Sequence, residues 1–226
     1  MTCTLAELAD RARALVGGGR RAVLGITGPP GAGKTTLAES LLAALAPHPP
    51  AGLAPGGWVA HVPMDGFHLA DAELDRLGLR DRKGAPETFD AWGYAALLRR
   101  LLADEDDMVY APGFDRRLEQ PIAGTIGVAG PARLVLTEGN YLLLTDGRWA
   151  GLRGLFSEVW YADLEPAERL RRLIARHVRF GKEPAAAAEW ATGTDERNAA
   201  LIAATRDRAD LVVPSALLGE PGAAPE

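Results

Sequence analysis

The sequence has few cysteines, few lysines and no long apolar stretch. Cys3 is the only cysteine, so the chain can form no internal disulfide, and such cysteine usage suits a reducing compartment. No run of about 18 apolar residues is present, and the N-terminus lacks the basic-then-apolar pattern of a secretory signal. We therefore expect a cytoplasmic protein that is not exported and has no membrane partner.

The charged residues exclude further classes of function. The formal net charge of −5 argues against broad, non-specific binding to nucleic acid, although it leaves room for a local basic pocket. Four scattered histidines and one cysteine make no metal-binding cluster. Only three of the 25 basic residues are lysines, at positions 34, 83 and 182. A lysine can therefore mark a place that needs a compact ammonium, and an ordinary surface position stays open for Lys83 and Lys182.

A glycine-rich stretch near the N-terminus is the most informative feature of the chain. Residues 28–35 read Gly-Pro-Pro-Gly-Ala-Gly-Lys-Thr and stand between an apolar run at 22–26 and a helix-like run at 36–42. In a loop of this G-x-x-x-x-G-K-T spacing, backbone N–H groups cradle phosphate oxygens, the lysine reaches the β- and γ-phosphates, and the threonine hydroxyl can bind Mg²⁺. The structural alternative is a turn rich in glycine and proline. We expect ATP and Mg²⁺ as cofactors, bound by Gly28, Gly31, Ala32, Gly33, Lys34, Thr35 and Thr36.

Strand-like and helix-like segments alternate along the chain. This alternation predicts an α/β protein with the three-layer P-loop nucleoside triphosphate hydrolase fold, in which helices cover both faces of a parallel sheet. We expect one domain over 1–226, with a small helical lid at about 166–190 and a frayed tail at about 219–226. Strands are expected at 21–27, 58–62, 108–110, 133–137, 157–162 and 211–213, and helices at 4–16, from the glycine loop to 46, and at 69–77, 89–103, 166–179 and 184–206.

Two carboxylates follow predicted strands. Asp65 lies in the segment 63–68 after the second predicted strand, and Glu138 lies in the segment 137–141 at the end of a later one. Ligands of open α/β sheets bind at the carboxyl ends of the strands, so both side chains are expected near the γ-phosphate. A phosphoryl acceptor hydroxyl needs a carboxylate to take its proton, and Mg²⁺ needs oxygen ligands. We assign Asp65 as the base and Glu138, with Thr35, to the metal shell or a substrate hydroxyl; a cap or turn role is the alternative for each carboxylate.

Two polar segments and one arginine-rich helix could surround the substrate. The segments 82–90 and 110–117 combine charge, glycine, proline and an aromatic residue, and each is either a substrate site or a surface loop. Arginines recur at helical spacing at 169, 172, 176 and 179. We expect Arg176 to lie over the ATP phosphates as part of the lid and to act in catalysis, whereas the other arginines form a solvated face. His177, on the apolar side, is expected to pack in the core.

Taken together, residues 28–35, 64–68, 82–90, 138–142, 176–177 and 181–182 resemble one family. They are similar to the P-loop kinases that group phosphoribulokinase, uridine kinase and type I pantothenate kinase, and most of all to a nucleoside/nucleotide kinase branch in which some members are labelled fructose-transport-system kinases. The matches span nearly the whole chain, from 22 to about 202. The resemblance implies ATP-dependent phosphorylation of a small-molecule hydroxyl, with Asp65 as the base.

The resemblance also implies a set of site residues, while the acceptor stays open among a nucleoside, a pantothenate-like compound and a sugar. Uridine kinases carry Asp-x-Phe-Tyr where this chain has Asp65 to His68, and pantothenate kinases carry segments rich in tyrosine and histidine at 113–116. Asn198 resembles a substrate-side asparagine of the pantothenate kinases. We expect Lys34, Asp65, Glu138 and Arg176 in catalysis, and Asp65, His68, Lys83, Phe89, Tyr110, Arg116, Tyr141 and Asn198 at the substrate.

Two other classes of function compete with a kinase. One is a nucleotide-operated switch or regulatory ATPase that acts on a protein partner. No lysine has an aspartate two residues later, so the guanine-reading Asn/Thr-Lys-x-Asp motif of G proteins is absent, and so is the Ser-Gly-Gly-Gln signature of ABC proteins. The other class is a degenerate kinase kept as a binding protein, and the intact Lys34, Thr35, Asp65 and Glu138 count against it. We expect a kinase with a small-molecule partner and no nucleic acid, and leave a homodimer open.

Overall fold

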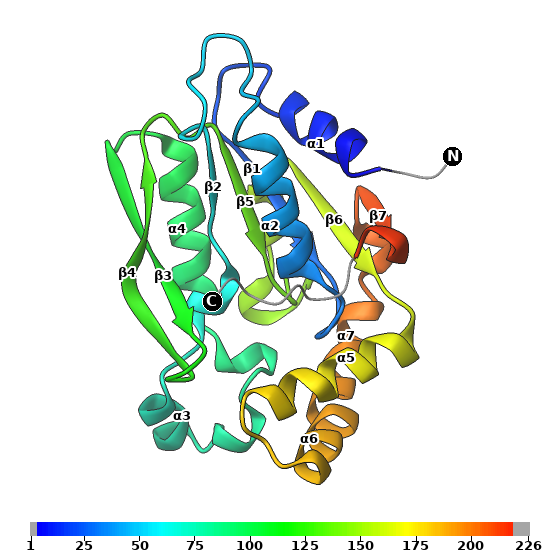
Figure 1. Ribbon diagram of the computed structural model, residues 1–226. Helices are drawn as coiled ribbons and strands as arrows, with labels where there is room; N and C mark the ends of the chain where they lie inside the picture. The colour runs from blue at the N-terminus through cyan, green and yellow to red at the C-terminus, as the bar shows by residue number, and fades with distance from the viewer. Residues whose placement is uncertain (1–3, 219–226) are drawn as a thin grey trace.

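A parallel sheet of five strands forms the centre of the molecule (Figure 1). The computed structural model describes residues 4–218, so Cys3 and the expected tail at 219–226 lie outside it. The strand order is β2-β5-β1-β6-β7, and every residue of β1 and β5 is buried, which accounts for their largely apolar sequences. The strands are β1 (Ala22–Thr27), β2 (Val59–His61), β5 (Leu134–Glu138), β6 (Glu158–Asp163) and β7 (Leu211–Pro214).

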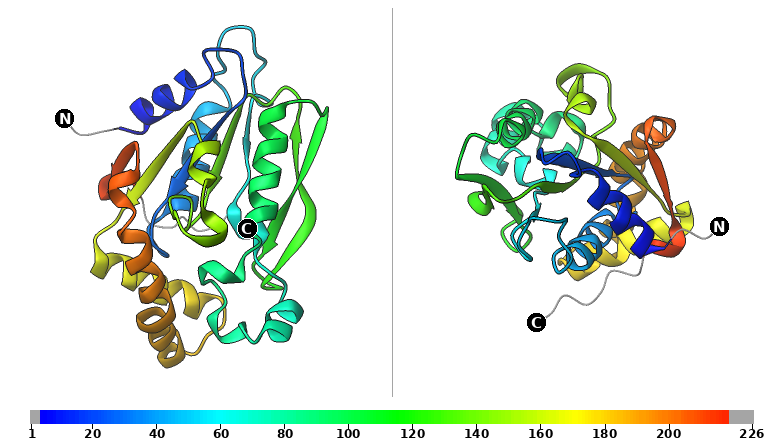
Figure 2. Two further views of the ribbon diagram at one scale, coloured as in Figure 1. Left: turned by 180° about the vertical axis from the view of Figure 1, so that it is seen from behind. Right: turned by 90° about the horizontal axis from the view of Figure 1, so that it is seen from above.

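Helices cover both faces of this sheet (Figure 2). On one face, α1 (Leu5–Ala14) and α2 (Lys34–Leu45) bury their leucines against the even-numbered residues of β1. On the other face, α4 (Ala91–Ala103) and α7 (Glu196–Ala203) form a second apolar core with the segment that follows β5. The expected three-layer α/β fold is therefore confirmed.

A β-hairpin beside α4 departs from the sequence prediction. β3 (Met108–Asp115) pairs antiparallel with β4 (Gln120–Ala129), whereas the sequence predicts a short strand at 108–110 and a polar loop at 110–117. The prediction is wrong here because β4 carries little local strand signal. It contains two glycines and no regular alternation of apolar and polar residues, and a bulge interrupts the pairing. Its conformation therefore comes from pairing with β3 rather than from its own sequence.

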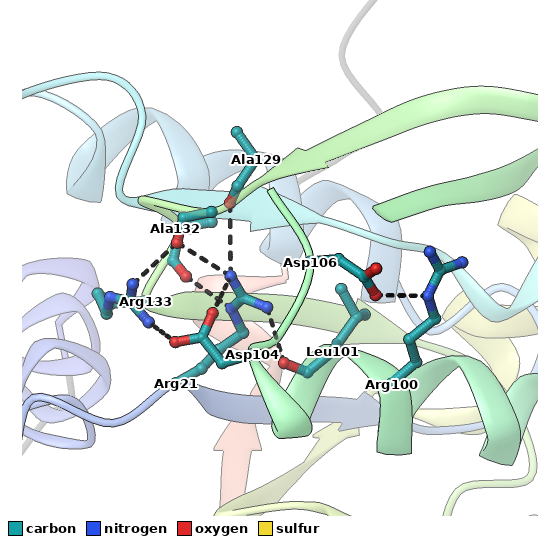
Figure 3. Close-up of polar contacts among 9 residues, drawn as sticks. Arg21, Arg100, Leu101, Asp104, Asp106, Ala129, Ala132 and Arg133 are labelled. Atoms are coloured by element: carbon teal, nitrogen blue, oxygen red, sulfur yellow. Dashed lines mark hydrogen bonds and ion pairs between the residues drawn. The ribbon is translucent and has the colours of Figure 1, made fainter. Parts of the chain in front are cut away.

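Arg21 anchors the base of this hairpin to the sheet (Figure 3). The residue precedes β1, and its side chain is 1% exposed. The guanidinium donates to the carbonyl oxygens of Ala132 and Leu101, each at 2.7 Å, and pairs with Asp104 at 2.7 Å. Asp104 also pairs with Arg133. The contacts join the start of β1 to the end of α4 and to the segment after β4, at the end of the sheet opposite the glycine loop.

The helices after β6 match the prediction in part. α5 (Pro166–Arg179) has the expected bounds. The single helix expected at 184–206 is instead divided into α6 (Pro184–Trp190), a π-helical turn (Ala191–Asp195) and α7. Together with α3 (Asp71–Leu77), α5 and α6 lie beyond the carboxyl ends of the strands, where a lid is expected (Figure 1). Within residues 4–218, no helix combines the length and the apolar character that crossing a membrane requires.

Candidate active site

The glycine loop takes a shape that requires glycine. Gly28, Gly31 and Gly33 have φ values of 150°, 83° and 87°. A Cβ on Gly28 would lie 2.8 Å from the carbonyl oxygen of Ala162, and a Cβ on Gly31 would lie 2.9 Å from that of Arg169. α2 begins directly after the loop without a side-chain cap, so the N–H groups of its first turn can serve an anion. The loop therefore fits nucleotide phosphates. The other expected loop residues, Ala32 and Thr36, lie in the loop and in the first turn of α2.

Lys34 folds back over this loop from the first position of α2. It is 8% exposed, and its Nζ donates to the carbonyl oxygen of Pro29 at 3.0 Å. Burial lowers the pKa of Lys34 to about 8, and the charges of Glu138 and Asp65 oppose this shift. An ammonium has three donors, so Lys34 can serve a phosphate as well as the loop carbonyl.

Thr35 and Glu138 meet where α2 approaches β5. Oγ1 of Thr35 donates to Oε1 of Glu138 at 3.0 Å. Glu138 is 3% exposed, and burial together with the charge of Asp65 raises the pKa of its carboxyl group. Mg²⁺ keeps several waters and needs only one or two protein carboxylates beside phosphate oxygens, so this hydroxyl and carboxylate fit it. Within residues 4–218, no group of three or more His, Cys, Asp or Glu side chains could hold a metal by itself.

Asp65 stands on the open side of the same site. It lies in the short 3₁₀ turn Met64–Phe67 that follows β2, and its Oδ2 is 3.7 Å from Nη2 of Arg116 on the hairpin. The structure thus brings together the residues that the sequence predicts for catalysis, since the charge of Asp65 acts on Lys34, Glu138 and Arg176.

His68 follows the same turn and stacks among aromatic rings. Its ring centroid is 3.9 Å from that of Phe89 and 5.0 Å from that of Phe114. In the part of the chain that the structure describes, Nδ1 of His68 is buried without a hydrogen-bond partner. Burial lowers the pKa of His68 to about 4, so the ring is neutral at pH 7. Phe89, only 1% exposed, supports the ring, and the contact of His68 with a substrate stays a prediction.

Tyr141 and Asn198 meet at one backbone carbonyl. The Tyr141 hydroxyl donates to the oxygen of Gly84, and Nδ2 of Asn198 donates to the same oxygen at 3.3 Å. Both side chains are buried. The two predicted substrate residues therefore fix the segment 82–90 in place; their direct contact with a substrate stays a prediction.

Lys83 lies beside this cluster, with its Nζ 5.7 Å from the ring centroid of Phe114, whereas Tyr110 lies outside it. Nζ of Lys83 binds Oδ1 of Asp71 at 2.7 Å and the carbonyl oxygen of Glu119 at 2.5 Å, so Lys83 joins its loop to α3 and to the hairpin. Tyr110 is 64% exposed and alternates along β3 with Val109, which packs in the core. The substrate roles expected for Lys83 and Tyr110 stay predictions.

The arginines of α5 form the solvated face that the sequence predicts only in part: Arg179 is exposed, whereas Arg169 and Arg172 are not. Arg169 is 3% exposed, donates to the carbonyl oxygen of Pro30 at 3.2 Å and pairs with Glu196. Arg172 donates to the carbonyl oxygen of Leu218 at 2.6 Å. The prediction is wrong for these two because α5 packs against the glycine loop and the end of the described chain. Sequence reasoning misses Arg169 as a support of the loop, although its helical spacing from Arg176 is a usable signal.

The next residues of α5 face the site and the π-helical turn. Arg176 is exposed, and the charges around it are those of Arg116, Asp65, Asp195 and Glu138. Nε2 of His177 lies 2.7 Å from Oδ2 of Asp195, so the expected packing of His177 in the apolar core is wrong.

A strand, a glycine loop, a helix that starts at the lysine and carboxylates at the ends of two adjacent strands define a P-loop phosphotransfer enzyme.

Comparison with known proteins gives the family. The chain is 37% identical over 199 residues to "Uncharacterized protein YggC" of Escherichia coli strain K12, covering 86% of this chain and 78% of that protein. It is 34% identical over 179 residues to "Putative uridine kinase C227.14" of Schizosaccharomyces pombe, with 77% and 74% covered. The solved structure of a "putative fructose transport system kinase" from Silicibacter sp. TM1040 matches with a TM-score of 0.83 and 36% identity, covering 94% of this chain and all of that one. No family model matches the chain. The chain belongs to the P-loop kinases of the uridine kinase-like and pantothenate kinase-like family.

Proposed function

We propose that this protein transfers the γ-phosphoryl group of ATP to a hydroxyl group of a small polar metabolite. The observation that carries the proposal is the convergence of Asp65 and Glu138 on Lys34 at the glycine loop. The relatives named as a uridine kinase and a fructose transport system kinase support phosphorylation of a small molecule. A nucleoside, a pantothenate-like compound and a sugar are the candidate acceptors.

The nucleotide side of the site is built from cations and backbone donors. The glycine loop and the first turn of α2 hold phosphate oxygens, and Lys34 and Arg176 place positive charge where negative charge develops during transfer. Thr35 and Glu138 would hold Mg²⁺, which would supply further positive charge to the phosphates. Arg169 keeps the loop in shape through the carbonyl of Pro30.

The acceptor side needs a base and a means of orienting the hydroxyl. Asp65 takes the hydroxyl proton, because its side chain is 30% exposed whereas Glu138 is buried and bound by the Thr35 hydroxyl. The ring of His68, stacked between Phe89 and Phe114, offers the acceptor an aromatic surface beside Asp65. Such a site combines an apolar ring surface with few polar groups, as small-molecule sites usually do.

The proposal is tested by measuring ADP release with ATP and Mg²⁺ alone and then with uridine, pantothenate or fructose. Mass spectrometry of the acceptor identifies the phosphorylated product, and Lys34→Ala supplies the background rate. We expect slow release without an acceptor and a large rise with one acceptor class. A fast rate that no acceptor changes and that a protein partner stimulates would contradict the proposal and favour a regulatory ATPase.

A further inference from the structure

The four residues Asp195–Asn198, here called the junction segment, touch two separate parts of the molecule, α5 and the loop around Gly84. Asp195 binds His177 on α5 at 2.7 Å, Glu196 pairs with Arg169, and Asn198 donates to the carbonyl oxygen of Gly84 at 3.3 Å. Arg169 in turn binds the glycine loop at Pro30. One short segment thus contacts the loop on the acceptor side and two positions of the lid helix, one of which, Arg169, holds the phosphate loop.

Two polar side chains of this segment lie on the inward face of the helix. Asp195 ends the π-helical turn at Ala191–Asp195, and Asn198 follows three residues later, a spacing that puts both on one side of a helix. They are 9% and 4% exposed, while Arg197 between them is exposed. Burying a carboxylate and an amide is costly unless each is paired, and both are paired here. The inward arrangement is therefore a specific feature of this helix rather than a by-product of apolar packing.

The charge of Asp195 also reaches both substrate sides. It acts on Arg176, the residue before His177, and on Tyr141. Tyr141 binds the same Gly84 oxygen as Asn198 does. Asp195 therefore lies close enough to the lid arginine and to Tyr141, which fixes the acceptor loop, for its charge to act on both.

We propose that Asp195 and His177 are positioning residues that join nucleotide binding to the order of the acceptor loop around Gly84. The inference rests on the proposed kinase function and adds to it a physical connection between the two substrate sides. Phosphates that bind the glycine loop and Arg176 restrain Arg169 and α5. The pairs of Arg169 with Glu196 and of His177 with Asp195 carry that restraint to the junction segment, and Asn198 carries it to Gly84.

Hydrogen exchange tests this connection without knowledge of the acceptor. Amide exchange is followed by mass spectrometry with and without Mg²⁺ and the non-hydrolysable analogue AMP-PNP, in the full chain. In the wild type we expect the analogue to slow exchange at residues 83–88 by at least about threefold, because local opening of that loop becomes rarer. His177→Leu and Asp195→Leu should lose this protection while still binding the analogue.

Two matched variants distinguish a positioning role of the pair His177–Asp195 from a general contribution to stability. His177→Gln keeps an N–H that can donate to Asp195, so it should retain the protection that His177→Leu loses. Arg153→Gln removes an ion pair of the same 2.7 Å length, with Asp210, away from the site and should behave as the wild type. With an acceptor in hand, His177→Leu should lower kcat at least about tenfold and change the KM for ATP less than about threefold.

Three results would overturn the inference. The first is that the analogue binds the wild type without protecting residues 83–88. The second is full protection in a folded His177→Leu variant. The third is an equal loss of protection in His177→Gln and His177→Leu. If either leucine variant does not fold, the wild-type response and the glutamine variant still decide the matter. If the wild type phosphorylates no acceptor but the analogue still protects residues 83–88, that result contradicts the proposed function alone.

Discussion

At the scale of single residues, Asp65 and Glu138 have unlike surroundings although both act on Lys34. Asp65 is partly exposed beside Arg116, whereas Glu138 is buried and accepts the Thr35 hydroxyl. Two carboxylates in different environments can divide the work of proton acceptor and metal ligand. The surroundings favour Asp65 as the proton acceptor, because an entering metabolite can reach it.

Exchanging each carboxylate for its amide separates these roles. Asp65→Asn should lower kcat by roughly 10²–10⁴-fold with little change in ATP affinity, because the amide has nearly the same shape but cannot accept the proton. Glu138→Gln should instead raise the Mg²⁺ concentration needed for half-maximal rate, since an amide is a weaker ligand for the cation. Steady-state rates over a range of ATP and Mg²⁺ concentrations measure both effects. The opposite pattern would reverse the assigned roles.

Gly66 fixes where Asp65 stands. A Cβ at this position would lie 2.1 Å from the carbonyl oxygen of Pro112, a backbone atom of the hairpin, so Gly66→Ala must displace the turn or the hairpin. We expect a loss of about 1–3 kcal/mol in the free energy of unfolding and a fall in kcat. Gly154→Ala is the control, because nothing lies within 4 Å of its added Cβ. Urea unfolding and kcat compare the two variants. If Gly66→Ala matches Gly154→Ala in both measurements, the close approach of Gly66 to Pro112 is not needed.

At the scale of elements, Arg21 joins the base of the hairpin and the end of α4 to the start of β1 through buried hydrogen bonds and an ion pair. Arg21→Met leaves the buried carbonyls of Leu101 and Ala132 and the Asp104 carboxylate without the guanidinium. We expect a loss of about 3–5 kcal/mol in the free energy of unfolding, and unchanged nucleotide affinity because the anchor lies at the far end of β1.

The control for Arg21 is a neighbouring ion pair (Figure 3). Arg100 pairs with Asp106 at 2.7 Å, but the Arg100 side chain is 53% exposed, so Arg100→Gln should destabilise the protein far less than Arg21→Met. Urea unfolding compares the two variants, and nucleotide titration confirms that the site is intact. Equal destabilisation by both substitutions would refute the anchoring role of Arg21.

The elements differ in how far the sequence predicts them, and the reason is physical. β1, α2, β5 and α5 carry strong local signals, namely buried apolar runs, the glycine loop and helical spacing. β4 and the π-helical turn do not, because strand pairing and tertiary contacts determine them. Asp65 and Glu138 converge as predicted since parallel strands end at one edge of the sheet. Lys83 has partners on α3 and the hairpin that no local pattern reveals.

At the scale of the whole molecule, two arms from different parts of the chain meet beside Asp65. The guanidinium of Arg116 on the hairpin lies 6.0 Å from the ring centroid of Phe180, which follows α5. Gly181 then turns the chain with a φ of 95°. A cation over an aromatic ring contributes on the order of 0.5–1 kcal/mol at an exposed site, so this contact can open and close at little cost. Such a contact suits a site that must admit one substrate and exclude water during transfer.

The stability of the whole molecule should depend on pH through two partly buried histidines. Burial lowers the pKa of His61 and of His68 from 6.5 to about 4. Below pH 6.5 the unfolded chain binds protons at both positions while the folded chain does not, so stability is unaffected above that pH and falls as the pH drops towards 4. Since each pKa unit corresponds to about 1.4 kcal/mol, we expect the free energy of unfolding to fall by about 2–5 kcal/mol in all between pH 6.5 and roughly 4.5.

Urea unfolding over this range measures the slope of the free energy of unfolding against pH. The slope is compared in the wild type, in the double variant His61→Gln/His68→Gln and in His48→Gln, whose histidine is exposed. The double variant should show a shallower slope and His48→Gln the wild-type slope; a double variant with the wild-type slope would mean that the two partly buried histidines do not cause the pH dependence.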